Sequence, residues 1–156
     1  MAVEGLLPRA GVAARVSVNS KRQALIAAAE VAARVSGLPL AVVQAALLKR
    51  EKAGSTGVGD GVALPHGRVE GLRRACAVFL RLETPVDFKA VDDQPVDLIF
   101  ALLAPAEAPG SEHLQALAKI SRLLRQADLR RQLRQAQTAD AIYALLVREE
   151  AQPSAA

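Results

Sequence analysis

Residues 50–68 read REKAGSTGVGDGVALPHGR and combine two arginines, two hydroxyl residues, five glycines and a histidine in one short segment. The apolar spacing before residue 50 is typical of a helix, and the glycines after it indicate a turn. Residues 62–64 then favour a very short strand. The segment therefore predicts a helix, a glycine-rich turn and a strand that ends at a histidine.

The glycines of this segment match neither of two common nucleotide-binding motifs. A phosphate loop needs Gly-Lys followed by Ser or Thr after a strand, and the sequence contains no such run. A dinucleotide motif also follows a strand, whereas residues 57–61 follow a helix. The remaining interpretation is a concave loop whose amides, with the hydroxyls of Ser55 and Thr56, favour an anion. A plain tight turn is the alternative.

His66 is restricted by both of its neighbours. Pro65 has a fixed φ, and Gly67 leaves space on the far side for a ligand or for the backbone of a partner. A neutral imidazole is well populated near pH 7, so a histidine presented beside an anion site can attack a phosphoryl group. A structural histidine is the alternative.

Two further side chains are candidates because their helical positions point inward. Arg50 stands three residues after Leu47 and seven after Val43, so it continues the apolar face of its helix. The alternative is a cation that complements the helix dipole. His113 lies in the first turn of a later helix, where free amides disfavour imidazolium and the ring can donate to a phosphate. A partly buried structural histidine is the alternative.

Helices and a central strand are predicted on either side of this segment. Ser20 and Gln23 have the spacing of a capping box, and Gly37 is placed to end the helix that Ser20 begins. A second helix is predicted over residues 39–50. Residues 96–103 are apolar almost throughout, which is typical of a strand covered on both faces.

The remaining elements complete a layered fold. Further strands are predicted at residues 13–18, 62–64 and 76–82, and turn residues occur at 84–88 and 92–95. Three C-terminal helices are predicted with N-caps at Ser111, Asp128 and Thr138. Helices, a small mixed sheet and more helices predict a three-layer α/β architecture.

Length and composition limit the range of functions. The 156 residues predict one domain over 1–156, with an ordered core at about 10–150 and a frayed tail at 152–156. A net charge of +4 and 3% aromatic residues argue against nucleic-acid binding, and the arginines at 122–134 fit solvated helix faces. The single cysteine suits a reducing compartment. No signal peptide or membrane-spanning run is found, so we expect a cytoplasmic protein without membrane insertion.

The segment GDGVALPHG at 59–67 resembles the active-site signature of phosphotransferase-system enzyme IIA domains of the fructose, mannitol and nitrogen-regulatory type. The wider segment 50–67 is most similar to the nitrogen-regulatory branch. The resemblance covers nearly the whole chain, including residues 83–88 and 94–103. It implies a mixed sheet flanked by helices, which agrees with the layout predicted above.

The resemblance also implies roles for the candidate residues. His66 would accept a phosphoryl group from a histidine phosphocarrier protein and hold it as a phosphohistidine, with Arg50 and His113 in support. The phosphate-binding candidates are Ser55, Thr56, Gly57 and Gly67. No metal or other cofactor is expected, because the donor is already a phosphohistidine.

Two functions are compatible with this resemblance. The first is a phosphoryl-relay regulator whose phosphorylation state alters its binding to target proteins, which in the family include potassium-transport and sensor-kinase components. The second is a sugar-specific IIA component that passes the phosphoryl group to a IIB domain for uptake of fructose or mannitol. The sequence leaves open whether the chain forms a homodimer.

Overall fold

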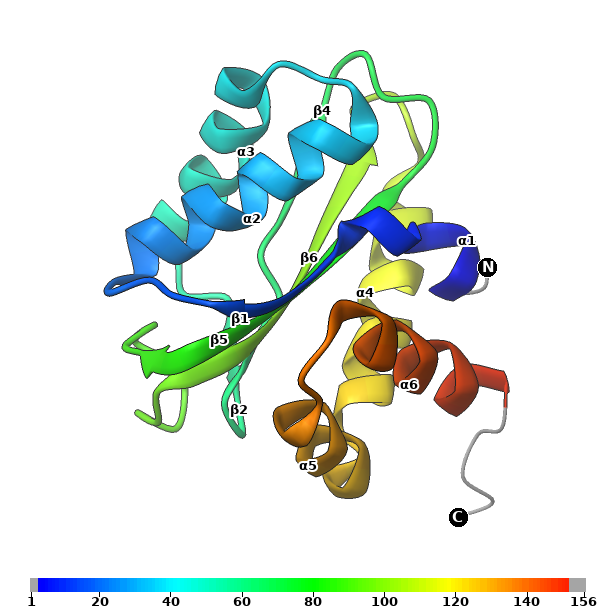
Figure 1. The fold of residues 1–156 in the computed structure, drawn as a ribbon. Coiled ribbons are helices and arrows are strands. Elements are labelled where there is room, and N and C mark those ends of the chain that lie inside the picture. Colours follow the sequence, from blue (N-terminus) through cyan, green and yellow to red (C-terminus); the bar gives the residue numbers. More distant parts are fainter. Residues whose placement is uncertain (1–2, 152–156) are drawn as a thin grey trace.

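The computed structural model describes residues 3–151, and Figure 1 shows the arrangement of its elements. In chain order these are α1 (Val3–Leu6), η1 (Arg9–Gly11), β1 (Val12–Val16), α2 (Lys21–Ser36), α3 (Leu40–Lys52), β2 (Gly57–Gly59), β3 (Val62–Ala63), β4 (His66–Val69), β5 (Cys76–Val86), β6 (Val96–Pro105), α4 (Gly110–Leu124), α5 (Ala127–Gln135) and α6 (Ala139–Ala151). The tail predicted to fray at 152–156 lies outside the described residues. Within residues 3–151, no helix combines the length and apolarity needed to cross a membrane.

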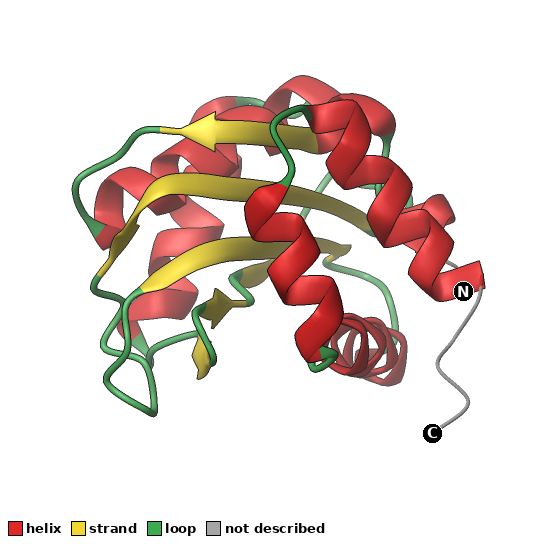
Figure 2. Ribbon diagram, turned by 60° about the horizontal axis from the view of Figure 1, so that its bottom comes forward, coloured by secondary structure: helices red, strands yellow, loops and turns green. Residues whose placement is uncertain are grey.

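The strands form one mixed sheet with the order β1-β5-β6-β3-β2, and β4 also pairs with β6. The long strands β5 and β6 are antiparallel, whereas β1 is parallel to β5 (Figure 2). Both β3 and β4 pair in parallel with β6, through Val62↔Leu98 and His66↔Leu102. The two short strands therefore follow β6 in succession, and His66 begins the second of them.

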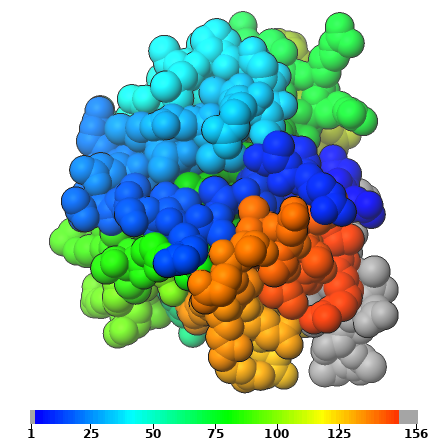
Figure 3. Space-filling model, in the orientation of Figure 1, coloured from blue at the N-terminus to red at the C-terminus, as the bar shows by residue number. Residues whose placement is uncertain are grey.

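Helices cover both faces of the sheet, with α2 and α3 on one side and α4, α5 and α6 on the other. Figure 3 shows the outer surface of these layers, with α2 and α3 in blue and cyan above and α5 and α6 in orange below. Along β6, Ile99 and Leu103 belong to the core under α2 and α3, while Phe100 and Leu102 belong to the core on the opposite face. The predicted three-layer α/β architecture is confirmed, and burial on both faces explains the apolar run of β6.

Several helix ends lie where the sequence predicts them. Ser20 Oγ accepts a hydrogen bond from the Gln23 amide at 3.1 Å at the start of α2. That helix ends at Gly37, whose φ of 78° is readily adopted by glycine. Thr138 Oγ1 accepts from the Ala141 amide at 3.1 Å at the start of α6. These three predictions are confirmed.

Two other predicted caps are wrong. Helix α4 begins at Gly110, directly after Pro109, so Ser111 lies inside the first turn rather than before it. Pro109 has a φ of −58° and starts the helix earlier than a serine cap would. Asp128 likewise lies inside the first turn of α5, where its charge complements the helix dipole.

The strand predictions are incomplete. Strands β2 and β4 were not predicted, and His66 begins a strand instead of ending one. Strand β5 continues to Val86, through part of the turn predicted at 84–88. The pairing of β1 with β5 extends only to Leu82, so Pro85 removes no hydrogen bond from that pairing.

Candidate functional site

Three predicted site residues meet where α3, β4 and the first turn of α4 come together. Arg50 Nε lies 3.1 Å from His66 Nε2, and the ring centroids of His66 and His113 are 5.3 Å apart. Strand β4 pairs with the C-terminal half of β6, and α4 follows β6 after a short loop. The sheet thus brings His113 beside His66, and all three side chains are partly buried.

The hydrogen bonds of His66 identify its tautomer. Nδ1 lies 2.9 Å from the carbonyl oxygen of Leu64, and a carbonyl can only accept, so Nδ1 carries the proton. Nε2 then has a lone pair, which accepts the hydrogen bond from Arg50 Nε. Nε2 is therefore the ring nitrogen that is able to act as a nucleophile. The sequence did not identify Leu64 as the partner, because a backbone carbonyl leaves no signal in residue type.

The surroundings of both histidines lower their pKa values and so favour the neutral form of each ring. Burial lowers the pKa of His66, the hydrogen bond to the Leu64 carbonyl partly offsets this, and the charge of Arg50 lowers the pKa further. Burial also lowers the pKa of His113, and the neighbouring His66 and Arg68 act in the same direction. The neutral form is the one in which an imidazole nitrogen can act as a nucleophile.

An NMR titration of the ring protons is expected to give midpoints below about 6.5 for both His66 and His113. Because the unfolded chain binds these two protons more readily, their contribution to stability is complete above about pH 6.5 and decreases as pH falls toward the folded-state values. The same titration in urea serves as control and should return both midpoints to the ordinary range. A native midpoint for His66 above that range would contradict a buried neutral ring.

The guanidinium of Arg50 forms hydrogen bonds both to His66 and to the loop that follows α3. Nε donates to His66, and Nη1 donates to the carbonyl oxygen of Gly54 at 2.9 Å. A guanidinium has five N–H donors in one plane, so these two contacts fix its orientation and leave further donors for an anion. The inward position predicted from helical spacing places Arg50 at this site.

His113 occupies the first turn of α4, as its position in the sequence predicts. Its Nδ1 is buried and has no hydrogen-bond partner in the described part of the chain. The ring also borders a cavity of about 560 Å³, together with Arg73, Arg74 and Pro109. Leaving a buried ring nitrogen without a partner costs free energy.

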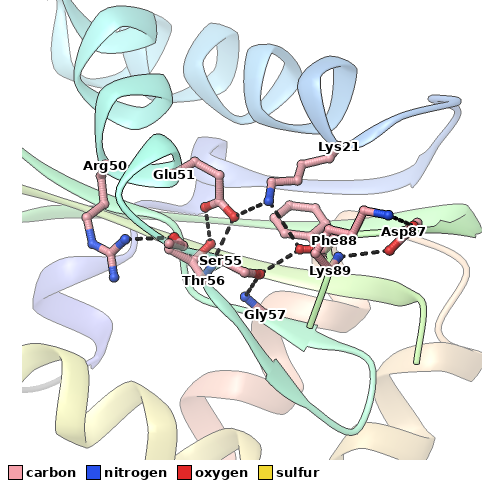
Figure 4. A network of polar contacts seen from close by, with 10 residues as sticks. Lys21, Arg50, Glu51, Ser55, Thr56, Gly57, Asp87, Phe88 and Lys89 are labelled. Atoms are coloured by element: carbon pink, nitrogen blue, oxygen red, sulfur yellow. Dashed lines mark hydrogen bonds and ion pairs between the residues drawn. The ribbon is translucent and has the colours of Figure 1, made fainter. Parts of the chain in front are cut away.

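The loop predicted to bind phosphate makes its polar contacts within the chain (Figure 4). Thr56 donates its amide and its hydroxyl to the carboxylate of Glu51, at 3.0 and 2.5 Å. Ser55 Oγ donates to the Phe88 carbonyl at 2.6 Å and accepts from the Gly57 amide at 3.1 Å. The loop therefore does not present the open nest that its glycines predict. Phosphate binding by Ser55, Thr56 and Gly57 stays a prediction.

Glu51 is a candidate that the sequence analysis missed. The residue is 7% exposed, and Lys21 Nζ lies 2.8 Å from its Oε1. A glutamate in the last turn of a helix would ordinarily be placed in solvent. The signal that could have identified it is its unfavourable position, because a negative charge at the C-terminal end of a helix opposes the helix dipole.

Gly67 allows β4 and α3 to approach closely. A Cβ atom at Gly67 would lie 3.1 Å from Ala46 Cβ and 3.3 Å from the Ala46 carbonyl carbon and oxygen. The space that the sequence analysis assigned to a ligand or partner is thus filled by α3 of the same chain. Ala46 precedes Arg50 by one helical turn, so the contact at Gly67 sets how near Arg50 lies to His66.

Gly67→Ala is expected to destabilise the fold by about 1–3 kcal/mol, because the added methyl group forces α3 away from β4. Urea unfolding monitored by circular dichroism measures this change. Gly110→Ala is the matched control, since a Cβ at Gly110 has nothing within 4 Å. Equal stability of the two variants would show that the α3–β4 contact tolerates a side chain.

The sequence matches known proteins over most of its length. The family model described as "Phosphoenolpyruvate-dependent sugar phosphotransferase system, EIIA 2" matches residues 6–149. A nitrogen regulatory protein of Bradyrhizobium diazoefficiens is 47% identical over 146 residues, which cover 94% of this chain and 91% of that protein. One of Escherichia coli is 43% identical over 155 residues, which cover 99% of this chain and 94% of that protein.

Solved structures share this fold. The crystal structure of the nitrogen regulatory protein IIA-Ntr from Neisseria meningitidis has a TM-score of 0.85 at 39% identity, covering 92% of this chain and 98% of that one. The mannitol IIA protein of Escherichia coli has a TM-score of 0.75 at 24% identity, covering 89% and 97% of the two chains. From the extent of these matches, we conclude that the chain belongs to the EIIA 2 family of the phosphoenolpyruvate-dependent sugar phosphotransferase system.

Proposed function

We propose that this chain is a phosphoryl-relay regulator that accepts a phosphoryl group on Nε2 of His66 from a histidine phosphocarrier protein. The observation that carries the proposal is the arrangement of His66 between the Leu64 carbonyl and Arg50, which leaves the Nε2 lone pair next to a cation. Members of this family are phosphotransfer components. A neutral nucleophilic nitrogen beside a guanidinium is the chemistry that such a transfer needs.

The proposed reaction exchanges one phosphorus–nitrogen bond for another. The bond between phosphorus and the donor's histidine breaks, its electron pair returns to the donor nitrogen, and a new bond forms to Nε2 of His66. The proton on Nδ1 of His66 stays in place, hydrogen-bonded to Leu64. Arg50 Nε, which first donates to Nε2, transfers its hydrogen bond to a phosphoryl oxygen as the lone pair is used.

Charge stabilisation is the main requirement of this step. Phosphoryl transfer passes through a loose, in-line transition state with negative charge on the equatorial oxygens. Arg50 would bind those oxygens as a cation, and His113 would donate an N–H to one of them. These assignments rest on the proximity of the three side chains. The free energy for the transfer comes from the phosphohistidine of the donor, so the proposal needs neither a nucleotide nor a metal.

We favour regulation of target proteins over sugar uptake as the function of this chain. The nitrogen regulatory relatives cover 94% and 99% of this chain, whereas a fructose-specific IIA component of Haloferax volcanii covers 65% at 39% identity. A phosphoryl group adds a charge of about −1.5 to −2. Exposed Arg68, Arg73 and Arg74 lie on segments next to the site, so a docking surface there would change with phosphorylation. Potassium-transport or sensor-kinase components are the kind of target that fits this proposal, with this chain in the cytoplasm.

Intact-mass measurement after incubation with phosphoenolpyruvate, enzyme I and the phosphocarrier tests the transfer. We expect a mass gain of one phosphoryl group that is lost in acid, as expected for a phosphohistidine. Adding a fructose IIB domain then separates the two functions. A regulator should retain its phosphate, and rapid transfer to the IIB domain would favour the sugar-uptake alternative. No mass gain at all would refute the phosphoryl relay.

A further inference from the structure

A buried carboxylate lies directly behind the proposed site and is not part of it. Glu51 follows Arg50 on α3, but its side chain points into the loop between α3 and β2 (Figure 4). Its Oε1 accepts from the Thr56 amide and pairs with Lys21, and its Oε2 accepts from the Thr56 hydroxyl. Both carboxylate oxygens are thus occupied.

We propose that Glu51 and Thr56 are positioning residues that keep the guanidinium of Arg50 aimed at Nε2 of His66. This inference rests on the proposed function, since Arg50 matters there as the group that stabilises the transferred phosphoryl. Within residues 3–151, neither of the two residues forms a hydrogen bond or ion pair with His66 or His113. They act through the backbone of the loop that follows α3.

The first step of the argument is the loop itself. Only residues 53–55 separate the last residue of α3 from Thr56. The Gly54 amide donates to the Glu51 carbonyl at 3.2 Å at one end of this loop, and the Thr56 amide and hydroxyl are fixed on the Glu51 side chain at the other. The main-chain and side-chain oxygens of Glu51 therefore hold both ends of the loop.

The second step connects the loop to Arg50. The Gly54 carbonyl, which lies between these two fixed points, accepts from Arg50 Nη1 at 2.9 Å. Because the guanidinium is planar and rigid, a fixed Nη1 also fixes the direction of the Nε–H bond. That bond is the one aimed at Nε2 of His66, at 3.1 Å. Loosening Thr56 would therefore let Arg50 rotate away from the histidine.

The third step concerns charge. Within residues 3–151 the ion-pair partner of Glu51 is Lys21 from the start of α2, and no ion pair joins Glu51 to the adjacent Arg50. Lys21 and the two Thr56 donors balance the carboxylate. The charge of Arg50 is consequently left for the phosphoryl group instead of being neutralised by its neighbour.

The test uses Thr56→Val, which removes one hydroxyl donor but keeps the shape of the side chain and the charge of Glu51. We expect transfer from the phosphocarrier to His66 to slow about three- to tenfold, with the loss in the transfer rate rather than in apparent affinity. Thr56→Ser restores the hydroxyl and should recover most of the rate. Glu51→Gln should also slow transfer. Glu30→Gln, at an exposed position of α2, is its matched control and is expected to have no effect.

Two readouts separate positioning from a general loss of structure. The charged and titratable groups around His66 are Arg50, Glu51 and His113, and Thr56→Val alters none of them. Displacement of Arg50 should nevertheless raise the pKa of His66 in an NMR titration. In an Arg50→Ala background, Thr56→Val should change transfer by less than about twofold, because the residue through which it acts is absent.

The outcomes distinguish this inference from the function it rests on. Equal rate losses with and without Arg50, or an unchanged pKa of His66 in Thr56→Val, would overturn the positioning role. If the unaltered chain takes up no phosphate, the proposed function fails. The NMR titration of His66 then still decides whether Thr56 positions Arg50.

Discussion

Replacement of His66 by alanine is expected to abolish phosphate uptake completely. The substitution removes Nε2, which in the proposed mechanism is the atom that forms the bond to phosphorus, and no other group can take its place in that geometry. The ring centroid of His113 lies 5.3 Å from that of His66, and the planes of the two rings are inclined by 53° to each other. Intact mass after incubation with phosphoenolpyruvate, enzyme I and the phosphocarrier measures the result.

His113→Ala is the control for this experiment because it removes the other imidazole and keeps the proposed acceptor. We expect it to take up one phosphoryl group more slowly, since a donor to the phosphoryl oxygens is lost while Nε2 of His66 and Arg50 remain. A mass gain in His66→Ala would place the phosphate on another residue. Loss of uptake in His113→Ala alone would exchange the roles of the two histidines.

The parts of the fold that the sequence predicted are those governed by local chemistry. The serine cap and the closing Gly37 of α2 depend on residues within a few positions of each other. The apolar run of β6 reflects burial on both faces. The strand predictions failed where pairing partners decide the structure. Strand β2 is rich in glycine, and β4 contains a glycine and an exposed arginine, so neither has a typical strand sequence. Each forms a strand only because it has a pairing partner, which is β3 for β2 and β6 for β4.

The candidate site divides in the same way. Helical spacing and the position of a histidine in the first turn of α4 were enough to select Arg50 and His113, and Pro65 marked His66. The Leu64 carbonyl, the carboxylate of Glu51 and the contact of Gly67 with Ala46 depend on how the chain folds back on itself. Backbone acceptors and close packing have no residue signature, so periodicity could not reveal them.

Arg50→Ala is the second substitution for which we expect a large effect, a loss of transfer rate on the order of 100-fold or more. Removing the guanidinium deletes the cation that would stabilise the transition state, and it also frees Nε2 of His66 from its hydrogen-bond donor. The charge of Arg50 lowers the pKa of His66, so the variant should show a higher pKa and more imidazolium near neutral pH. The loss of the cation raises the barrier to transfer, and the higher pKa reduces the fraction of neutral, reactive ring.

Rapid-quench measurement of phosphate transfer from the phosphocarrier, repeated over a range of pH, separates these two causes. At pH well above the pKa of His66 the ring is neutral in both proteins, so the loss that remains there reports the missing cation alone. Arg50→Lys tests geometry at constant charge. A lysine ammonium cannot reproduce the planar contacts with Gly54 and His66, and it should recover only part of the rate. Full recovery by lysine would mean that a positive charge suffices, and full activity of Arg50→Ala would remove Arg50 from the site.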